Sequence, residues 1–386
     1  MTGKDSPQPA DAGRGIVICA GGKRYFTCAW MLVSLLRHHG CRLPIELWHR
    51  GPGEIDRGMA DLIATRGVDV RDLGELAGTA LAATPEALRV AAIRASGFSQ
   101  VMWMDADCAP LADPERLFDW PSYRDTGLLL FGDGTDLTAD HPAWATLGLD
   151  PRSVAGVDAG LLLVDKTRRQ DVLEAAPQVA TALAAITRPG RRSPAALLLA
   201  AILADAPFGM ADRPPFEVEY DLVHRDRDGE ALVQHRLTAK WNFSGQDRET
   251  PSPETTAAAR AAMAELVDRW SGAIFVPPGR GAAALACEAA LAAKRRFLYQ
   301  SADGTWRRLD LHPGGRIGEG RGDFEQHWAV VDQDGRLILQ FYSDIRLTIA
   351  FTDLGDGTWR GASCGPPGFA ARLAPENCPG LTVTVP

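Results

Sequence analysis

The chain has 386 residues, of which 46% are hydrophobic, and its formal net charge is −8. A length of this order accommodates about two domains, each with a core of its own. The acidic balance and the lack of a long basic run argue against nucleic acid as the main partner.

Nothing in the sequence predicts secretion or insertion into a membrane. Residues 1–13 are polar and contain Pro and Gly, so we interpret them as a flexible tail rather than a signal peptide. No segment reaches the ~18 consecutive apolar residues of a membrane span. The seven cysteines have no CxxC spacing, which predicts neither a disulfide framework nor a zinc site. We therefore expect a cytoplasmic protein.

Strand and helix patterns alternate along the first half of the chain. Strands are predicted at 15–22, 43–51, 67–73 and 101–107, and helices at 25–40, 55–67 and 85–96. Such alternation predicts a mainly parallel α/β sheet with helices on both faces. Further strands are predicted at 126–131, at 157–166 and within 231–243, so the α/β domain extends over residues 14–250.

The pattern changes after residue 250. Residues 251–296 predict a helical linker, and 297–361 predict a small antiparallel β module. Asp-Gly pairs at 303–304, 334–335 and 356–357 indicate hairpin turns within that module. Its aromatic residues are expected in the module's core rather than on a sugar-binding surface, and 362–386 are expected to be irregular. The aromatic residues in question are Trp306, Trp328, Tyr342 and Trp359.

The segment VMWMDADCAP, residues 101–110, is the most informative in the chain. An apolar strand leads directly to Asp105 and Asp107, and ligands of parallel sheets bind at the carboxyl ends of strands. Alternation along an extended chain directs both side chains to the same side. Two such carboxylates repel unless a cation lies between them or one is protonated. Mg²⁺ or Mn²⁺ shared with a diphosphate would satisfy them, whereas capping of the following turn is the simpler structural alternative.

Four segments in this order resemble GT-A-fold glycosyltransferases, close to the α-mannosyltransferase-like family and more distantly to glycogenin-type enzymes. They are GIVICAGGKRYFTCAWMLVSLLRHHGCRLPIELWHRG, ALRVAAIRASGFSQVMWMDADCAPLADPERLF, DAGLLLVDK and QHRLTAKWN, which together span about residues 14–245. The resemblance implies a nucleotide-sugar donor, a UDP- or GDP-hexose, held through a divalent metal.

The resemblance also implies a role for individual residues. Asp105 and Asp107 form the DxD motif, in which Asp107 binds the metal and Asp105 shares it and contacts the ribose. His235 is the third metal ligand, and Lys240 contacts the diphosphate. Arg89 reaches the donor, and the loop Ala20-Gly21-Gly22 contacts the nucleoside. Without the resemblance, His235 would be an ordinary core histidine and Lys240 a solvated charge.

The sequence departs from the family pattern in two places. Asp158-Ala159-Gly160 replaces the usual Glu-Ser-Gly, and we expect Asp158 to face the donor sugar or the acceptor. Arg191 and Arg192 replace an acidic segment that usually lines the sugar pocket. Either the acceptor is anionic or this loop has left the site.

These features predict a metal-dependent hexosyltransferase that acts on an acceptor hydroxyl with retention at the anomeric carbon. Lys240 and the metal would stabilise the leaving group, and Asp158 is the candidate nucleophile if the reaction uses one. A non-catalytic nucleotide-sugar-binding protein of the same fold is the main alternative. A haloacid-dehalogenase-type phosphatase is a lesser one, because Cys108 and Ala109 follow the acids where that family has Thr or Val.

Overall fold

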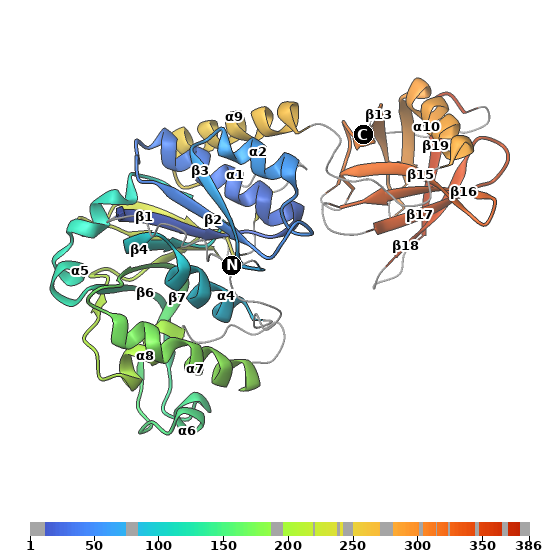
Figure 1. Cartoon of the computed structure of the whole chain (residues 1–386). Coiled ribbons are helices and arrows are strands. Elements are labelled where there is room, and N and C mark those ends of the chain that lie inside the picture. Colours follow the sequence, from blue (N-terminus) through green and yellow to red (C-terminus); the bar gives the residue numbers. More distant parts are fainter. Residues whose placement is uncertain are drawn as a thin grey trace, which may run out of the picture. The chain divides into compact units, whose positions relative to one another are not determined.

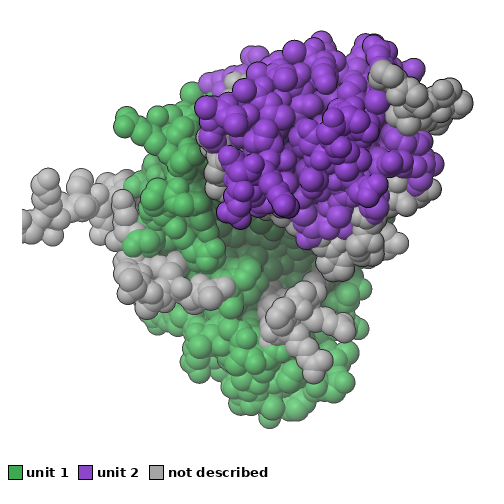
Figure 2. Space-filling view, turned by 90° about the vertical axis from the view of Figure 1, so that its right-hand side faces the viewer, with its two compact units in different colours: residues 1–241, 248–262 green, residues 242–247, 263–386 purple. Residues whose placement is uncertain are grey.

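The computed structural model divides the chain into two compact units (Figure 2). The first unit comprises residues 1–241 and 248–262, and the second comprises residues 242–247 and 263–386. The structure describes residues 12–74, 84–186, 196–218, 221–237, 240–241, 250–270, 281–300, 304–313, 315–322, 325–343, 347–364 and 370–378.

A seven-stranded sheet in the order β3-β2-β1-β4-β7-β6-β8 forms the centre of the first unit (Figure 1). Its strands are β1 (Ala12–Cys19), β2 (Ile45–His49), β3 (Val68–Asp72), β4 (Phe98–Met104), β6 (Leu128–Leu137), β7 (Val154–Asp165) and β8 (Gly209–Met210). All neighbouring pairs are parallel except those that β7 forms with β4 and with β6. The expected mainly parallel sheet is confirmed, with β7 as its one reversed strand.

Helices cover both faces of this sheet, as the alternating sequence predicts (Figure 1). Helices α1, α2 and α9 lie on one face, and α4, α7 and α8 lie on the other. The helices are α1 (Gly22–His38), α2 (Arg57–Ala64), α4 (Pro85–Ala95), η2 (a 3₁₀-helix, Pro114–Asp119), α5 (Pro121–Thr126), α6 (Ala143–Leu147), α7 (Gln170–Ile186), α8 (Ala196–Leu203) and α9 (Pro253–Arg269). None of the helices in the described part of the chain is long and apolar enough to cross a membrane.

A second, four-stranded sheet lies beyond the carboxyl end of β4. It has the order β5-β11-β10-β9, and every pairing in it is antiparallel. Its strands are β5 (Cys108–Pro110), β9 (Phe216–Val218), β10 (Asp221–Arg225) and β11 (Ala231–His235). Because β5 begins three residues after Asp105, the predicted acids lie in the turn that joins the two sheets.

The second unit is a closed barrel of eight antiparallel strands, β12 to β19, with helix α10 (Ala282–Lys294) packed against it. The strands are β12 (Arg296–Gln300), β13 (Trp306–His312), β14 (Arg316–Ile317), β15 (His327–Gln333), β16 (Arg336–Tyr342), β17 (Leu347–Asp353), β18 (Trp359–Ser363) and β19 (Ala370–Pro375). The predicted antiparallel β module is confirmed.

One predicted hairpin turn and most of the aromatic core of the barrel agree with the sequence pattern. Asp303 lies outside the described residues, and Asp356-Gly357 lie in the longer connection between β17 and β18. Asp334 and Gly335 have φ values of 54° and 80° between β15 and β16, which is the backbone that an Asp-Gly hairpin turn requires. Trp328, Tyr342 and Trp359 are 1%, 4% and 4% exposed, so they belong to the core of the module rather than to a binding surface. Trp306, the first residue of β13, is only half-buried.

The C-terminal part of the barrel differs from the sequence prediction. Strand β19 lies within 362–386, which were expected to be irregular, and it pairs with both β12 and β18. Its inward positions are occupied by Ala371 and Leu373, which are 1% and 0% exposed. A short strand that contains three alanines gives a weak alternation pattern, and pairing on both edges stabilises it.

The structure describes the expected N-terminal tail and the expected helical linker only in part. Of the expected tail 1–13, residues 1–11 lie outside the described residues, and β1 begins at Ala12. The expected linker 251–296 contains α9, α10 and the first residue of β12; residues 271–280 lie outside the described part. The division between the two units falls within α9.

Lys166 joins β7 to the end of α4, the helix that carries Arg89. Its Nζ donates to the carbonyl oxygens of Ser96 at 2.6 Å and of Ile93 and Arg94 at 3.3 Å. These carbonyls belong to the last turn of α4, where intrahelical donors are missing and a cation is favoured. Lys166 therefore fixes the end of α4 against the sheet.

We expect Lys166→Met to lower the free energy of unfolding of the first unit by about 1–2 kcal/mol, because the carbonyls lose a charged donor. Urea denaturation followed by tryptophan fluorescence measures the loss. Arg94→Met is the matched control: its side chain lies exposed in the last turn of the same helix, so the change should be under about 0.5 kcal/mol. An equal loss in both variants would show that the hydrogen bonds of Lys166 do not matter.

Candidate functional site

The loop from β1 to α1 forms one wall of a pocket. The amide of Ala20 donates to the carbonyl of Trp48 at 3.1 Å, and that of Gly22 donates to the carbonyl of Glu54 at 2.9 Å. A Cβ on Gly21 would lie 2.5 Å from the carboxyl carbon of Glu54, and Gly22 has a φ of 71°. The backbone of Gly22 therefore favours glycine, whereas a side chain at position 21 would displace the carboxyl group of Glu54.

The two acids after β4 come together through a turn rather than through strand alternation. The amide of Asp105 donates to the carbonyl of Gly160 at 2.9 Å, and the amide of Cys108 donates to the carbonyl of Asp105 at 2.9 Å. The chain turns over residues 105–107 before β5 begins. The predicted proximity of Asp105 and Asp107 is observed, although its cause is the turn.

His235 completes a group of three possible metal ligands. It ends β11 and is the register partner of Cys108, which places its ring beside the turn. Its Nε2 lies 3.3 Å from Oδ1 of Asp107 and 3.7 Å from Oδ2 of Asp105. One ligand atom from each of the three residues lies within 4.8 Å of the others. Two carboxylates and an imidazole are donors that Mn²⁺ accepts, and the carboxylates alone suit Mg²⁺.

Two cations contact these acids. The Nη2 of Arg89 lies 3.2 Å and 3.3 Å from the two carboxylate oxygens of Asp105, and its Nη1 contacts Glu86 at 2.5 Å. Burial opposes the charge of Arg89, but Glu86 and Asp105 outweigh it and raise the pKa of the guanidinium. Lys240 is hydrogen-bonded to Oδ2 of Asp107, and burial lowers the pKa of its ammonium group. Each acid therefore has one cationic partner.

The pocket has a volume of about 410 Å³ and combines these groups with aromatic walls. It is lined by Cys19, Ala20, Gly21, Tyr25, Trp48, His49, Arg50, Glu54, Leu73, Pro85, Leu88, Arg89, Trp103, Asp105, Ala106, Asp107, His235, Leu237 and Lys240. Every predicted site residue except Gly22 and Asp158 is among them. Gly22 lies next to the pocket, at the first position of α1.

The structure places Asp158 differently from the expectation that it faces the donor or the acceptor. It is 6% exposed, lies in β7 beneath His235, and is not part of the pocket lining. Its carboxylate is hydrogen-bonded to His235 and His224. The Asp-Ala-Gly segment alone does not predict this environment, because both histidines come from the other sheet.

Four groups of the pocket were missed in the sequence. Trp48 and Trp103 line it from the ends of β2 and β4, and Trp103 Nε1 donates to Asp105 Oδ1 at 2.8 Å. Arg50 Nε donates to Glu54 Oε1 at 2.7 Å beside the Gly21 loop. The available signal was their position at or just after the carboxyl ends of strands, since side chains at that end of a parallel sheet share one edge. Arg191 and Arg192, expected near the site, lie outside the described residues.

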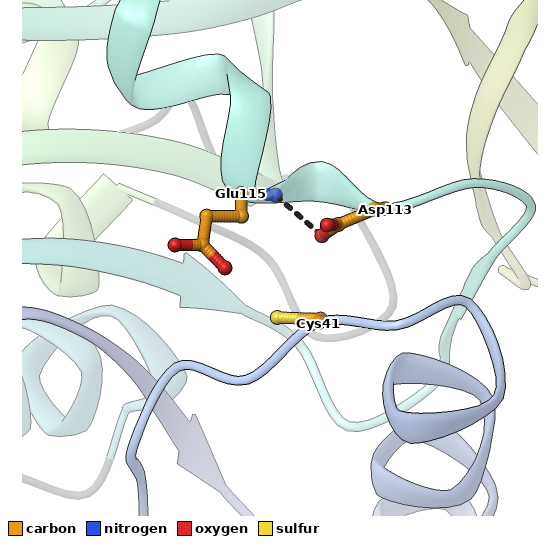
Figure 3. Close-up of side chains that lie close together, drawn as sticks. All are labelled: Cys41, Asp113 and Glu115. Carbon is orange, nitrogen blue, oxygen red and sulfur yellow. Dashed lines mark hydrogen bonds between the residues drawn. The ribbon is translucent and has the colours of Figure 1, made fainter.

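A second group of possible ligands lies elsewhere in the first unit, formed by Cys41, Asp113 and Glu115 (Figure 3). The amide of Glu115 donates to Oδ1 of Asp113 at 2.9 Å, which caps the start of η2. Burial raises the pKa of the Cys41 thiol to about 11. Because the thiolate is the form that binds metals, we interpret this group as a helix cap beside a buried thiol.

Comparison with known proteins supports the predicted resemblance. The model of a family described as "Mannosyltransferase putative" matches residues 13–147, which run from β1 to α6. Alpha-1,2-mannosyltransferase MNN22 of Candida albicans is 24% identical over 185 residues, which cover 43% of this chain and 31% of that protein. The chain thus spans about a third of the length of this curated relative.

Solved structures with a related shape include glycosyltransferases. The galactosyltransferase LgtC, in complex with donor and acceptor sugar analogues, is 14% identical with a TM-score of 0.43, covering 64% of this chain and 95% of that chain. The glycosyltransferase GlyE of Streptococcus pneumoniae TIGR4 is 13% identical with a TM-score of 0.40. The match covers 67% of this chain and 64% of that chain.

The resemblance to mannosyltransferases is confirmed for residues 13–147, the segment that carries Arg89, Asp105 and Asp107. His235, Lys240 and Asp158 lie beyond the segment that the family model matches. Their place in the site is given by the structure, through β7 and β11 and the segment that follows β11.

We expect Arg89→Met to lower the free energy of unfolding by about 2–3 kcal/mol, because Glu86 and Asp105 lose their shared cation. The loss falls at the lower end of the range for buried pairs, since the side chain of Asp105 is 26% exposed. Urea denaturation measures it. Arg57→Met, which removes an arginine whose side chain is 95% exposed, should change stability by less than about 0.5 kcal/mol. Wild-type stability of the Arg89 variant would contradict the role of this ion pair.

Proposed function

We propose that the first unit is a metal-dependent glycosyltransferase that moves a hexose from a nucleoside diphosphate sugar to an acceptor hydroxyl. The observation that carries this proposal is the convergence of Asp105, Asp107, His235 and Lys240 on one wall of a pocket with aromatic sides. These groups come from β4, β11 and the segment after β11, and such a mixture of acids and cations suits a ligand that arrives with both a divalent ion and phosphates.

The residues present fit Mn²⁺ or Mg²⁺. Both carboxylates present an oxygen toward Nε2 of His235, and the separation of these three groups matches one shared ion. When bound, the ion would neutralise the charge that develops on the departing diphosphate. Asp105, Asp107 and His235 would hold it, and the burial of Asp107 and His235 restricts the positions that it can take.

Lys240 would complete the neutralisation of the leaving group. Its ammonium contacts Asp107 and lies 5.6 Å from the ring centroid of Tyr25, so it is held at the pocket wall between an acid and an aromatic face. A diphosphate beside Asp107 would give this ammonium a second negatively charged partner. Arg89 acts more indirectly, because its contacts with Glu86 and Asp105 fix the orientation of Asp105.

The nucleoside would lie between the Gly21 loop and the ends of β2 and β4. Trp48, Trp103 and Tyr25 provide aromatic surface there, and the Arg50–Glu54 pair provides polar groups for a base or a ribose. We propose a UDP- or GDP-hexose as donor. The relatives are described as mannosyltransferases, which makes mannose the first sugar to test.

We further propose retention at the anomeric carbon by attack on the same face from which the diphosphate leaves, with the leaving phosphate accepting the proton of the acceptor. This mode requires no carboxylate nucleophile, and Asp158 is hydrogen-bonded behind His235 rather than exposed in the pocket. Among the described residues of the pocket, the carboxylates are Glu54, Asp105 and Asp107, and each has a cationic partner.

The cationic partners also support an alternative in which the chain binds the nucleotide without a metal. Arg89 on Asp105 and Lys240 on Asp107 already balance both acids. In that case the pocket would bind a nucleotide sugar without metal-dependent turnover. The two proposals differ in whether nucleotide binding requires the ion.

A thermal-shift panel of UDP- and GDP-linked hexoses, with and without Mn²⁺, tests the proposal. A donor at one hundred times its Kd stabilises the native state by about 2.7 kcal/mol, and we expect this shift only with Mn²⁺ present. Asp107→Asn should abolish the metal-dependent shift. Asp61→Asn, at a side chain that is 74% exposed, is the matched control and should retain it.

Release of nucleoside diphosphate by the wild-type protein then distinguishes transfer from binding alone. An equal thermal shift without Mn²⁺ would contradict the metal dependence and favour binding through Lys240 and Arg89. No shift with any donor would contradict the proposed function as a whole.

A further inference from the structure

The carboxylate of Asp158 is shared by two buried histidines. Oδ2 lies 2.7 Å from Nε2 of His224, and Oδ1 lies 2.8 Å from Nδ1 of His235. Oδ1 also accepts the amide hydrogen of Gly160 at 3.0 Å. The exposed fractions of Asp158, His224 and His235 are 6%, 2% and 5%, so water cannot replace these contacts. His224 carries no motif in the sequence that would mark it as part of a site.

The two histidines reach Asp158 from one face of the small sheet. His235 of β11 is the register partner of Leu222 in β10, and His224 follows Leu222 by two residues. Residues two apart on a strand share a face, so both rings project toward β7. His224 is also held by Phe131, whose ring centroid lies 5.2 Å away in an edge-on arrangement. The position of His224 is therefore fixed independently of His235.

The hydrogen bonds determine which nitrogen of His235 faces the acids. The carboxylate of Asp158 meets three hydrogen-bonding groups, the amide of Gly160 and one ring nitrogen of each histidine. An ionised carboxylate only accepts hydrogen bonds, so Nδ1 of His235 must be the donor. In the neutral ring, Nε2 then has a free lone pair, and it is the nitrogen 3.3 Å from Asp107.

Packing prevents the ring of His235 from turning away. A Cβ at position 160 would lie 2.3 Å from Cε1, 2.5 Å from Nδ1 and 2.9 Å from Nε2 of His235. The ring is therefore in contact with the backbone of Gly160 on one side. Gly160 in turn accepts the amide hydrogen of Asp105, so the ring and the first acid share one support.

We infer that Asp158 and His224 are positioning residues that hold His235 with Nδ1 protonated and Nε2 directed between Asp105 and Asp107. His224 orients the carboxylate, the carboxylate orients His235, and His235 presents its lone pair to a divalent cation. This inference rests on the proposed function, because it assigns Asp158 to the support of the metal site. Carboxylate–histidine–metal arrangements of this kind set both ring orientation and ligand basicity.

The first test measures Mn²⁺ affinity by electron paramagnetic resonance in the absence of donor. Asp158→Asn should weaken binding about 10- to 100-fold, because the amide can donate to Nδ1 and favour the wrong tautomer. His224→Leu should weaken it by up to about tenfold, while His224→Gln keeps a donor near the position of Nε2 and should restore most of the affinity. Wild-type affinity in Asp158→Asn and His224→Leu would overturn the inference.

The second test needs no metal and separates the inference from the proposed function. Long-range ¹H–¹⁵N spectra of protein labelled with ¹⁵N-histidine, recorded in alkaline solution where the rings are neutral, report the tautomer of His235. The wild-type protein and His224→Gln should show the Nδ1–H form, and Asp158→Asn should shift the population toward the Nε2–H form.

The two tests fail in different ways. If the wild-type protein shows the Nδ1–H form but binds no Mn²⁺, the proposed metal site is wrong. The hydrogen bond between His235 and Asp158 then has a structural role only. If the wild-type ring is in the Nε2–H form, the inference is wrong whatever the metal does. Should Asp158→Asn fail to fold, the pair His224→Leu and His224→Gln decides the question through loss and rescue of Mn²⁺ affinity.

Discussion

The repulsion between Asp105 and Asp107 is the constraint around which the pocket is built. Their side chains converge on one imidazole nitrogen, and the low exposure of Asp107, 4%, limits screening by water. The chain places a positive group against each acid from a different element: Arg89 from α4 and Lys240 from the segment after β11. The groups that contact these two acids therefore come from helix α4, from strand β11 of the small sheet and from the segment after β11.

The reversed strand β7 makes this convergence possible. Its pairing with β4 ends at Leu161, and its residues closer to the N-terminus pair with β6. Gly160 therefore supports the turn that contains Asp105, while Asp158 supports His235. Lys166, at the other end of β7, holds the end of the helix that carries Arg89. A single strand connects the supports of three groups that line the pocket.

Features that depend on neighbouring residues could be predicted from the sequence, whereas contacts between distant segments could not. Three kinds of feature could be predicted because each depends on a few neighbouring residues. They are the alternation of strands and helices, the acids after β4 and the Asp334-Gly335 turn. The pocket positions of His235 and Lys240 agree with the resemblance to a family. His224 and the true environment of Asp158 could not be predicted, because the contact joins β7 to β10 across two sheets and 66 residues of chain. Strand β19 was missed because its own alternation pattern is weak and one of its two partners, β12, lies far away in the sequence.

The closure of the barrel in the second unit brings the entry and the exit of its chain together. Phe297 at the start of β12 is the register partner of Pro375 at the end of β19, and the amide of Glu376 donates to the carbonyl of Arg296 at 3.1 Å. A module whose two ends are adjacent can be inserted into a loop of a host protein without stretching the host's backbone. The ends of the eight strands are therefore close enough to be joined, residue 296 to residue 375, in a circular permutant of the barrel strands that opens at the Asp334-Gly335 turn.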